Sequence, residues 1–457
     1  MEKNYAYSVL ELIGWGKFNV MMFIQCGLSW STFEIWFVNM GFVIEGTTEE
    51  WELDTFTAGI VGSFMQLGLM LGSLFWGYIG NTYGRVKAFK TTAIVASAAS
   101  VLLTFAPDPY VVGAGLFAMG FGLAGEISLG GTVFYEYCPP SKRYYMTLMS
   151  AFLSFGAIAV TTIALLVSLY NSTDYHNWRI IVAVGSAIEI ISMFFRFLMH
   201  ETPAFLITQN KQSAADKILN IVSLKNTGKG LAQVDHASAS VNPNELTQEL
   251  QTHKEDQIST KHALRKLFKK PLLKTTIVLG LVYMITHYSF SGFLYFMPEF
   301  LSEFSTSTAY AIILIQQLCG IPGVILGTYL VETRLGRRLT TNIFNILSGA
   351  AVIVFCFGSS FWFVVIVSGI IFMIVYLALS SMFTLGPESF PTSVRSTGLS
   401  LAMVCARFGG ILSPIITGYL LEVPNGFYIS LALFCGAYVI AGFLILFLEE
   451  TKGKKIG

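Results

Sequence analysis

Long apolar runs separated by short polar segments follow one another along the whole chain. Each run has at least about 18 residues, enough for an α-helix to cross a hydrocarbon core of about 30 Å. Because backbone groups in lipid must be hydrogen-bonded within the segment, we predict that these runs are membrane-spanning helices. The pattern contains twelve of them, at residues 18–44, 57–79, 88–105, 111–135, 146–169, 180–199, 275–296, 310–331, 340–357, 361–385, 397–421 and 427–448.

The composition supports this interpretation. Of the 457 residues, 54% are hydrophobic and 12% are charged, whereas soluble proteins carry roughly 25% charged residues. We therefore predict an all-α membrane protein whose surroundings are the lipid bilayer. A net charge of +1 gives no indication of a nucleic-acid partner. Residues 1–15 are polar and aromatic, so no cleavable signal peptide is expected.

The charged residues between the predicted spans separate by sign. Basic residues gather on one side, which predicts that this side is cytoplasmic, together with both termini. Acidic residues gather in the opposite loops, where Arg179 is the exception and Asn171 begins a glycosylation sequon. The membrane is either the plasma membrane or that of an intracellular vesicle or organelle. The basic set is Arg85, Lys87, Lys90, Lys142, Arg143, Arg334, Arg337, Arg338, Arg395, Lys452, Lys454 and Lys455, and the acidic set is Glu45, Glu49, Glu50, Glu52, Asp54, Asp108, Asp174, Glu299, Glu303 and Glu422.

Motifs of enzymes and metal sites are not found in the sequence. It has no G-x-S-x-G, H-E-x-x-H or P-loop pattern. Gly120-x-Gly122-x-x-Gly125 matches a dinucleotide fingerprint, but it lies inside an apolar helix, where small residues let helices pack closely. The six cysteines have neither metal-ligand spacing nor a pair in an outer loop. We expect no enzyme, no cofactor and no bound metal.

The two sets of six spans carry the same short motifs. An E-x-x-P-x-x-x-R pattern follows the fourth span at Glu136 and the tenth at Glu388, and a Gly-Arg pair follows the second span at Gly84 and the eighth at Gly336. Both correspondences have the same offset, 252 residues. Duplicated halves place a ligand site at their interface near the bilayer midplane. We predict an N-terminal half at 1–200, a cytoplasmic linker at 201–271 and a C-terminal half at 272–457.

The linker is expected to be mixed in structure. Thr202-Pro203 predicts the start of one short helix, and Ser213-x-x-Asp216 predicts the capping box of a second. Residues 226–261 have no aromatic residue and are predicted to be disordered. The basic segment 261–270 is either the positive flank of the seventh span or a surface that lies against the anionic inner leaflet.

These motifs resemble those of the major facilitator superfamily. Within it, the chain is similar to the branch of synaptic-vesicle-protein-related and organic-ion transporters, which includes bacterial aromatic-acid and nicotinate carriers. Residues 13–18 and 406–410 support that branch. The motifs that carry the resemblance are Gly77-x-x-x-Asn81-x-x-Gly84-Arg85, Glu136-x-x-Pro139-x-x-x-Arg143, Trp178-Arg179, Glu201-Thr202-Pro203-Ala204-Phe205-Leu206 and Pro387-Glu388-Ser389-Phe390-Pro391-Thr392-x-x-Arg395.

The resemblance implies twelve helices in two six-helix pseudo-repeats, alternating access and a set of gating residues near the cytoplasmic face. These residues are Asn81, Gly84, Arg85, Glu136, Arg143, Glu332, Arg337, Glu388 and Arg395. The family usually has Asp at the places of Asn81 and Thr333. Glu332 is the residue directly before Thr333. Its acidic pair in the first span matches Phe33 and Trp36, with Glu34 between them. Its fourth-span Arg matches Leu116, so the family's proton-coupling residues do not carry over as a set.

Several ionisable and polar residues lie inside the predicted spans. Charges at membrane depth are costly and normally face a cavity or a partner. Arg407 has the planar donor fork that suits a carboxylate ligand, or it forms a structural ion pair with Glu34 or Glu126. Each of those carboxyls is a candidate proton or cation site, or a packed counter-ion. The remaining candidate contacts are His287, which would otherwise be an interhelical hydrogen bonder, Tyr288, Gln316 and Gln317; Glu189 and Arg196 are expected to be structural.

Three functions follow from these residues. The favoured one is a secondary carrier of a small organic ion, an anion or carboxylate, driven by a gradient of protons or of substrate. The first alternative is a transporter-like protein that no longer transports and serves as a receptor, a scaffold or a subunit of a membrane assembly. The second alternative is an organic-cation carrier that uses Glu34 and Glu126. The sequence does not identify a protein partner.

Overall fold

The protein is described here from a computed structural model that covers residues 2–142, 145–170, 177–231, 260–391 and 394–451. All regular secondary structure in these ranges is helical, and no strand occurs in them. The sequon at Asn171, the predicted gating residue Arg143 and most of the segment predicted to be disordered lie outside the described residues.

The N-terminal half contains six long helices and three short ones. Their bounds are α1 (Glu2–Ile13), α2 (Lys17–Trp51), α3 (Thr55–Thr82), α4 (Arg85–Thr104), α5 (Pro109–Tyr137), η1 (Pro140–Lys142), α6 (Tyr145–Leu148), α7 (Ala151–Tyr170) and α8 (Asn177–Phe197). The linker follows with α9 (Pro203–Thr208), α10 (Gln212–Thr227) and α13 (Thr260–Leu267).

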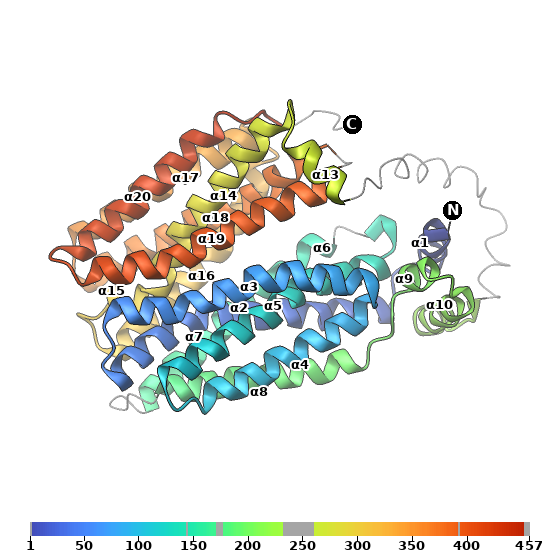
Figure 1. Cartoon of the computed structure of the whole chain (residues 1–457), viewed down its shortest axis with the longest axis horizontal. Coiled ribbons are helices and arrows are strands. Elements are labelled where there is room, and N and C mark those ends of the chain that lie inside the picture. The colour runs from blue at the N-terminus through green and yellow to red at the C-terminus, as the bar shows by residue number, and fades with distance from the viewer. Residues whose placement is uncertain (1, 143–144, 171–176, 232–259, 392–393, 452–457) are drawn as a thin grey trace.

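The C-terminal half repeats the pattern of six long helices. Their bounds, with those of two short helices, are α14 (Leu272–Tyr295), α15 (Met297–Phe300), α16 (Thr306–Leu330), α17 (Gly336–Val354), η2 (Phe355–Phe357), α18 (Phe361–Glu388), α19 (Arg395–Leu421) and α20 (Gly426–Ile445). Figure 1 shows the two halves as separate layers, with the first in blue to green and the second in yellow to red.

Eleven of the described helices are long and apolar enough to cross a membrane. The twelfth long helix, α2, is not among them. It has 35 residues, about 52 Å of helix at 1.5 Å per residue, and its interior carries Asn19, Gln25, Glu34 and Asn39, all of them buried. Polar residues can lie at membrane depth when they face other helices. The twelve predicted spans therefore correspond to the twelve long helices of the bundle.

Two predicted boundaries are wrong. The fifth span, predicted as continuous over 146–169, is divided into α6 and α7 by a turn at Met149 and Ser150. The first span was predicted to end at residue 44, but α2 continues to Trp51. Glu45, Glu49 and Glu50 therefore lie on the last turns of a helix rather than in a loop.

Local capping explains where several helices begin. Asp54 and Asp108 accept hydrogen bonds from the backbone amides of Thr57 and Val111, at 3.1 and 2.9 Å, which satisfies free amides at the starts of α3 and α5. Thr202 caps α9 in the same way, as its Thr-Pro sequence predicted. The capping box predicted at Ser213 is wrong, because α10 begins at Gln212 with Lys211 at the N-cap position.

One end of the bundle carries acidic residues and the other carries basic ones. We call them the acidic end, with Glu45, Glu50 and Glu422, and the basic end, with Arg85 and Arg337. The helices α1, α9, α10 and α13 all lie at the basic end (Figure 1).

Hydrogen bonds tie the short helices at the basic end to the bundle. The Asn226 side chain on α10 donates to the Gly14 carbonyl at 3.0 Å and to the Asn19 side chain at 2.7 Å. It also accepts a hydrogen bond from the Phe18 amide at 2.9 Å. The linker helix α10 is thus fixed to the start of α2.

The two halves meet along α3 and α19 toward the acidic end. The Thr55 hydroxyl donates to the Gly418 carbonyl at 2.9 Å, and Glu422 accepts from the Phe56 amide at 2.8 Å. A Cβ at Gly59 would lie 2.1 Å from the Pro414 carbonyl oxygen. The backbones are therefore in contact along the first part of α3, and only glycine permits that approach.

Candidate functional site

Arg407 of α19 lies at the interface between the halves. Its Nη1 donates a 3.4 Å hydrogen bond to Gln66 Oε1 of α3, and the guanidinium lies over the Phe33 ring of α2 at 6.0 Å. Among the described residues, no carboxylate oxygen lies within 4.0 Å of its nitrogens. The side chain is partly exposed. Most of the hydrogen-bonding capacity of this arginine is therefore unused.

Gln66 connects Arg407 to the seventh span. While its Oε1 accepts from Arg407, its Nε2 donates to the Tyr295 hydroxyl at 2.6 Å. The three side chains come from α3, α14 and α19, so they join both halves. Gln66 and Tyr295 are buried. Gln66 was not among the predicted site residues, because its only signal in the sequence was an amide inside an apolar run.

Glu34 of α2 is the carboxylate next to this cluster. Its side chain is 8% exposed, and no hydrogen bond or ion pair of Glu34 is described. It interacts electrostatically with Arg407 and with Tyr376 of α18. The ion pair with Glu34, which was one alternative to an anion site at Arg407, is therefore not formed at salt-bridge distance.

A cluster of aromatic rings begins at Phe33, beside Arg407, and crosses the interface between the halves. Phe33 stacks on Phe37 at 5.9 Å, and Phe37 stacks in turn on Phe290 of the other half at 6.1 Å. Tyr295 tilts against Phe37 at 5.5 Å, and Tyr376 meets Phe290 edge to face at 5.9 Å. A flat organic molecule can stack in such surroundings.

The two glutamines of α16, Gln316 and Gln317, are buried. Gln317 accepts a hydrogen bond from the Tyr376 hydroxyl at 3.1 Å, which links it to the aromatic cluster. Gln316 is fully buried, and neither its amide oxygen nor its nitrogen has a hydrogen-bond partner among the described residues. Both therefore have spare capacity to orient a ligand.

The structure places Glu126 in a different environment from Arg407. Its two oxygens accept from Arg196 Nη1 and Nη2 at 2.5 and 2.9 Å, and one of them accepts from Thr32 at 3.1 Å. Glu189 lies 3.6 Å from the same guanidinium, and all three charged side chains are fully buried. The possible pair of Arg407 with Glu126 is not formed. Arg196, expected to lie near the inner end of its span as a structural residue, is the partner of Glu126.

His287 and Tyr288 pack within the C-terminal half. The His287 ring stacks on Tyr283 of the same helix at 6.2 Å, and no hydrogen bond from it to another helix is described. Tyr288 meets Phe434 of α20 edge to face at 5.9 Å. His287 is nevertheless close enough to Arg407 to interact with it electrostatically. In the described part of the chain, no hydrogen bond joins His287 or Tyr288 to Gln66 or Glu34.

At the basic end, a polar network around Arg85 joins α3, α4 and α5 to the start of the linker. Arg85 bonds Asn81 one turn earlier, and its Nε lies 3.3 Å from Glu136 at the end of α5. Glu136 also accepts from the Thr202 hydroxyl at 2.5 Å. Glu201 accepts from the Val86 amide at the start of α4.

The C-terminal half repeats this network at matching positions. Arg337 lies 3.0 Å from Glu388, which also accepts from the Thr451 hydroxyl at 2.6 Å. Glu450 accepts from the Arg337 amide at 2.9 Å, in the place that Glu201 occupies in the first half. Glu332 pairs with Arg337 at 2.7 Å and so takes the part of Asn81. The same network is thus built twice, at the positions of the repeated motifs.

Arg395 has a more modest role in the described residues. It begins α19, and its Nε donates a 3.4 Å hydrogen bond to the Phe390 carbonyl. The matching Arg143 lies outside the described residues.

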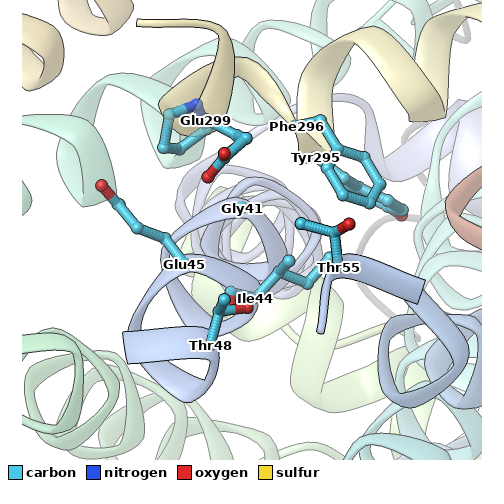
Figure 2. A pocket seen from close by; sticks show the side chains of 9 residues that line it. Gly41, Ile44, Glu45, Thr48, Thr55, Tyr295, Phe296 and Glu299 are labelled. Carbon is cyan, nitrogen blue, oxygen red and sulfur yellow. The ribbon is translucent and has the colours of Figure 1, made fainter. Parts of the chain in front are cut away.

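The acidic end is closed by polar contacts between the halves. The Tyr310 hydroxyl of α16 donates to Glu45 Oε2 of α2 at 2.8 Å. A small cavity lies beside this pair, between α2, the start of α3 and α15, and Figure 2 shows the Glu45 and Glu299 carboxylates at its edge. Arg179, the exception among the acidic loops, binds Glu50 at 2.7 Å. The cavity is far too small for an organic ligand. It is a gap in the packing where the two halves meet at the acidic end.

Two six-helix halves, charged side chains between them and a duplicated polar network at one end define a secondary transporter of the major facilitator type. Comparison with known proteins agrees. Residues 28–456 match the family described as "Sugar (and other) transporter", so the chain belongs to that family.

Relatives align with nearly the whole chain. A niacin transporter of Acinetobacter baylyi is 26% identical, with 98% of each chain covered. Organic cation/carnitine transporter 7 of Arabidopsis thaliana is 24% identical, covering 98% of this chain and 95% of its own. The synaptic vesicle 2-related protein of Pongo abelii is 22% identical, covering 98% and 81%. The solved inward open xylose transporter of E. coli has the same fold, with a TM-score of 0.74 at 16% identity, covering 96% of this chain and 98% of its own.

Proposed function

We propose that the protein carries a small organic anion with a flat apolar body, and that Arg407 binds its carboxylate. The observation that carries the proposal is the unused guanidinium between the halves, which makes one 3.4 Å hydrogen bond. A planar fork of donors recognises a carboxylate with two parallel hydrogen bonds. The relative named for niacin, a small aromatic carboxylic acid, supports this ligand class.

The surroundings of Arg407 supply the rest of the site. Phe33, Phe37 and Phe290 offer aromatic faces for the ligand body. Gln317, which bonds Tyr376 in the C-terminal half, offers a polar contact. Glu126 is assigned to a structural ion pair with Arg196 and is left out of the ligand site. A gradient of protons or of substrate would drive the transport.

We infer that the basic end faces the cytoplasm, because basic residues accumulate on the cytoplasmic side of membrane proteins. The halves touch at the opposite, acidic end, so the arrangement is inward-facing. Alternating access then requires the contacts of Thr55 and Phe56 with α19 to break while the basic end closes. The same orientation makes both termini and the linker cytoplasmic.

The test is Arg407→Lys, which keeps the positive charge and loses the planar fork. Uptake of benzoate or nicotinate into proteoliposomes should fall at least about tenfold, the equivalent of one charge-assisted hydrogen bond of about 1.5–3 kcal/mol. Arg265→Lys in the exposed part of α13 is the matched control and should leave uptake unchanged.

Unchanged uptake kinetics in Arg407→Lys would contradict the anion site. If neither the unaltered protein nor either variant takes up or binds any organic ion, the transport-inactive alternative is the better account. The loss of the loop acid at Asn81 is the observation that favours that alternative.

A further inference from the structure

The charges between the two halves are balanced but not paired. Arg407 projects from the C-terminal half and Glu34 from the N-terminal half, and they interact electrostatically. No oxygen of Glu34 lies within 4.0 Å of the Arg407 nitrogens, the distance of an ion pair. An ionised group at membrane depth without a partner is costly. The site thus holds one positive and one negative group, each with unused capacity.

The second carboxylate that the sequence offered for a cation is already occupied. Glu126 accepts two hydrogen bonds from Arg196 and one from Thr32. Glu34 differs from it in all these respects, because it is 8% exposed and has no described hydrogen bond. An entering cation would therefore be attracted to Glu34 rather than to Glu126.

A charge balance decides which ligand suits this site. A simple anion on Arg407 leaves the negative charge of Glu34 beside it, and like charges repel in surroundings of low polarity. A simple cation on Glu34 leaves Arg407 in the same position. A ligand with one charge of each sign compensates both groups at once.

We propose that the site takes a small aromatic zwitterion, with its carboxylate on Arg407 and its ammonium or quaternary nitrogen on Glu34. The ring between the two charges would pack on Phe33, Phe37 and Phe290, which already form a continuous stack across the interface. Aromatic faces also attract cations. The inference rests on the proposed function and specifies its substrate class.

The test uses three probes of nearly the same shape on the purified full-length protein. They are 4-(aminomethyl)benzoate, a zwitterion; 4-methylbenzoate, an anion; and 4-methylbenzylamine, a cation. Binding is measured by calorimetry in two buffers of different ionisation enthalpy, which also reports proton uptake. The zwitterion should bind at least about tenfold more tightly than either simple ion, as one charge-assisted interaction implies.

Two variants assign the charges. Glu34→Gln should remove the advantage of the zwitterion over 4-methylbenzoate, and Arg407→Gln should remove its advantage over 4-methylbenzylamine. Glu34→Asp retains the charge and should retain part of the advantage, which separates a charge effect from misfolding. Glu303→Gln, at an exposed position near the acidic end, is the control and should bind like the unaltered protein.

The other results overturn the proposal in distinguishable ways. Equal or tighter binding of 4-methylbenzoate, with uptake of one proton that Glu34→Gln abolishes, would make Glu34 a proton site and leave the anion carrier standing. If Glu34→Gln still bound the zwitterion more tightly than 4-methylbenzoate by the same factor, Glu34 would not bind the positive group, and the proposal would be wrong. Failure of all three probes to bind at millimolar concentration would overturn this inference and the proposed ligand class together.

Discussion

Two glycines at the basic end are required by carboxylates that approach the backbone. Gly336 has a φ of +72°, and a Cβ there would lie 2.6 Å from a carboxylate oxygen of Glu450. Gly84 has a φ of +126°, and a Cβ there would lie 2.4 Å from Glu201. In both cases the carboxylate binds amides at the start of the next helix. The repeated Gly-Arg pair is therefore a geometric requirement of the network.

The residue-scale prediction is that Gly336→Ala destabilises the protein by about 1–2 kcal/mol, the cost of a left-handed backbone for a residue with a Cβ, with a further loss from displacing Glu450. The apparent melting temperature in detergent should fall. Gly436→Ala is the control, because a Cβ there meets nothing within 4 Å inside α20. It should leave the melting temperature unchanged or raise it slightly, since alanine favours helix. Equal effects of the two changes would contradict this account.

At the scale of elements, the repeated loops were predictable and the partners inside the membrane were not. The pairs of Arg85 with Glu136 and of Arg337 with Glu388 follow from motifs at equivalent points of a duplicated sequence. By contrast, the pairing of Glu126 with Arg196 depends on how α5 rotates against α8. Hydropathy gives the length of a helix but not its rotation, so the sequence could not show which charges face each other.

Two helix boundaries were predicted wrongly for a related reason. The last turns of α2 are polar, and a hydropathy criterion assigned Glu45, Glu49 and Glu50 to a loop. They remain helical because they contact other elements: Glu45 binds Tyr310, and Glu50 binds Arg179. The break between α6 and α7 has no glycine or proline to announce it. Tertiary contacts, rather than local propensity, set these boundaries.

The acidic end should respond to pH through α15. Burial against α2, together with the nearby Glu49, raises the pKa of the Glu299 carboxyl above its usual range. Glu45 and Tyr310 are the other titratable groups at this contact. When the acidic end opens, water reaches Glu299 and its pKa returns toward about 4.3. The closed state therefore binds the proton more tightly than the open one.

This difference sets the direction in which pH shifts the equilibrium between the closed and the open acidic end. Protonation favours closure of the acidic end; the effect is complete below the ordinary pKa of a glutamate and is lost as the pH rises through the raised value. Distances between labels at the outer ends of α3 and α19 should lengthen as the pH increases. Glu299→Gln should reduce this pH dependence, whereas Glu303→Gln should not. An identical pH profile in Glu299→Gln would show that this carboxyl does not act in the closure.

At the scale of the whole molecule, the two halves were predictable from the duplication, and their relative arrangement was not. The sequence could place a site at their interface, but it showed none of the contacts that close the acidic end. Packing decides that: Gly59 and Gly418 let α3 and α19 touch near the acidic end. At the basic end, Asn81 bonds Arg85 within its own half and supplies no charge for a contact with the other half. We therefore expect the inward-facing state to dominate at rest.

We propose that this protein alternates between two states around the site at Arg407. The most direct measurement is the distance distribution between spin labels at Thr82 on α3 and Ser400 on α19, in lipid, with partly exposed native cysteines replaced. We predict a long distance at rest and a shorter one that gains population with an aromatic carboxylate bound and with Asn81→Asp. An added ionic contact of about 1.4 kcal/mol would change the ratio tenfold. A single distribution that neither the ligand nor Asn81→Asp alters would contradict alternating access in this chain.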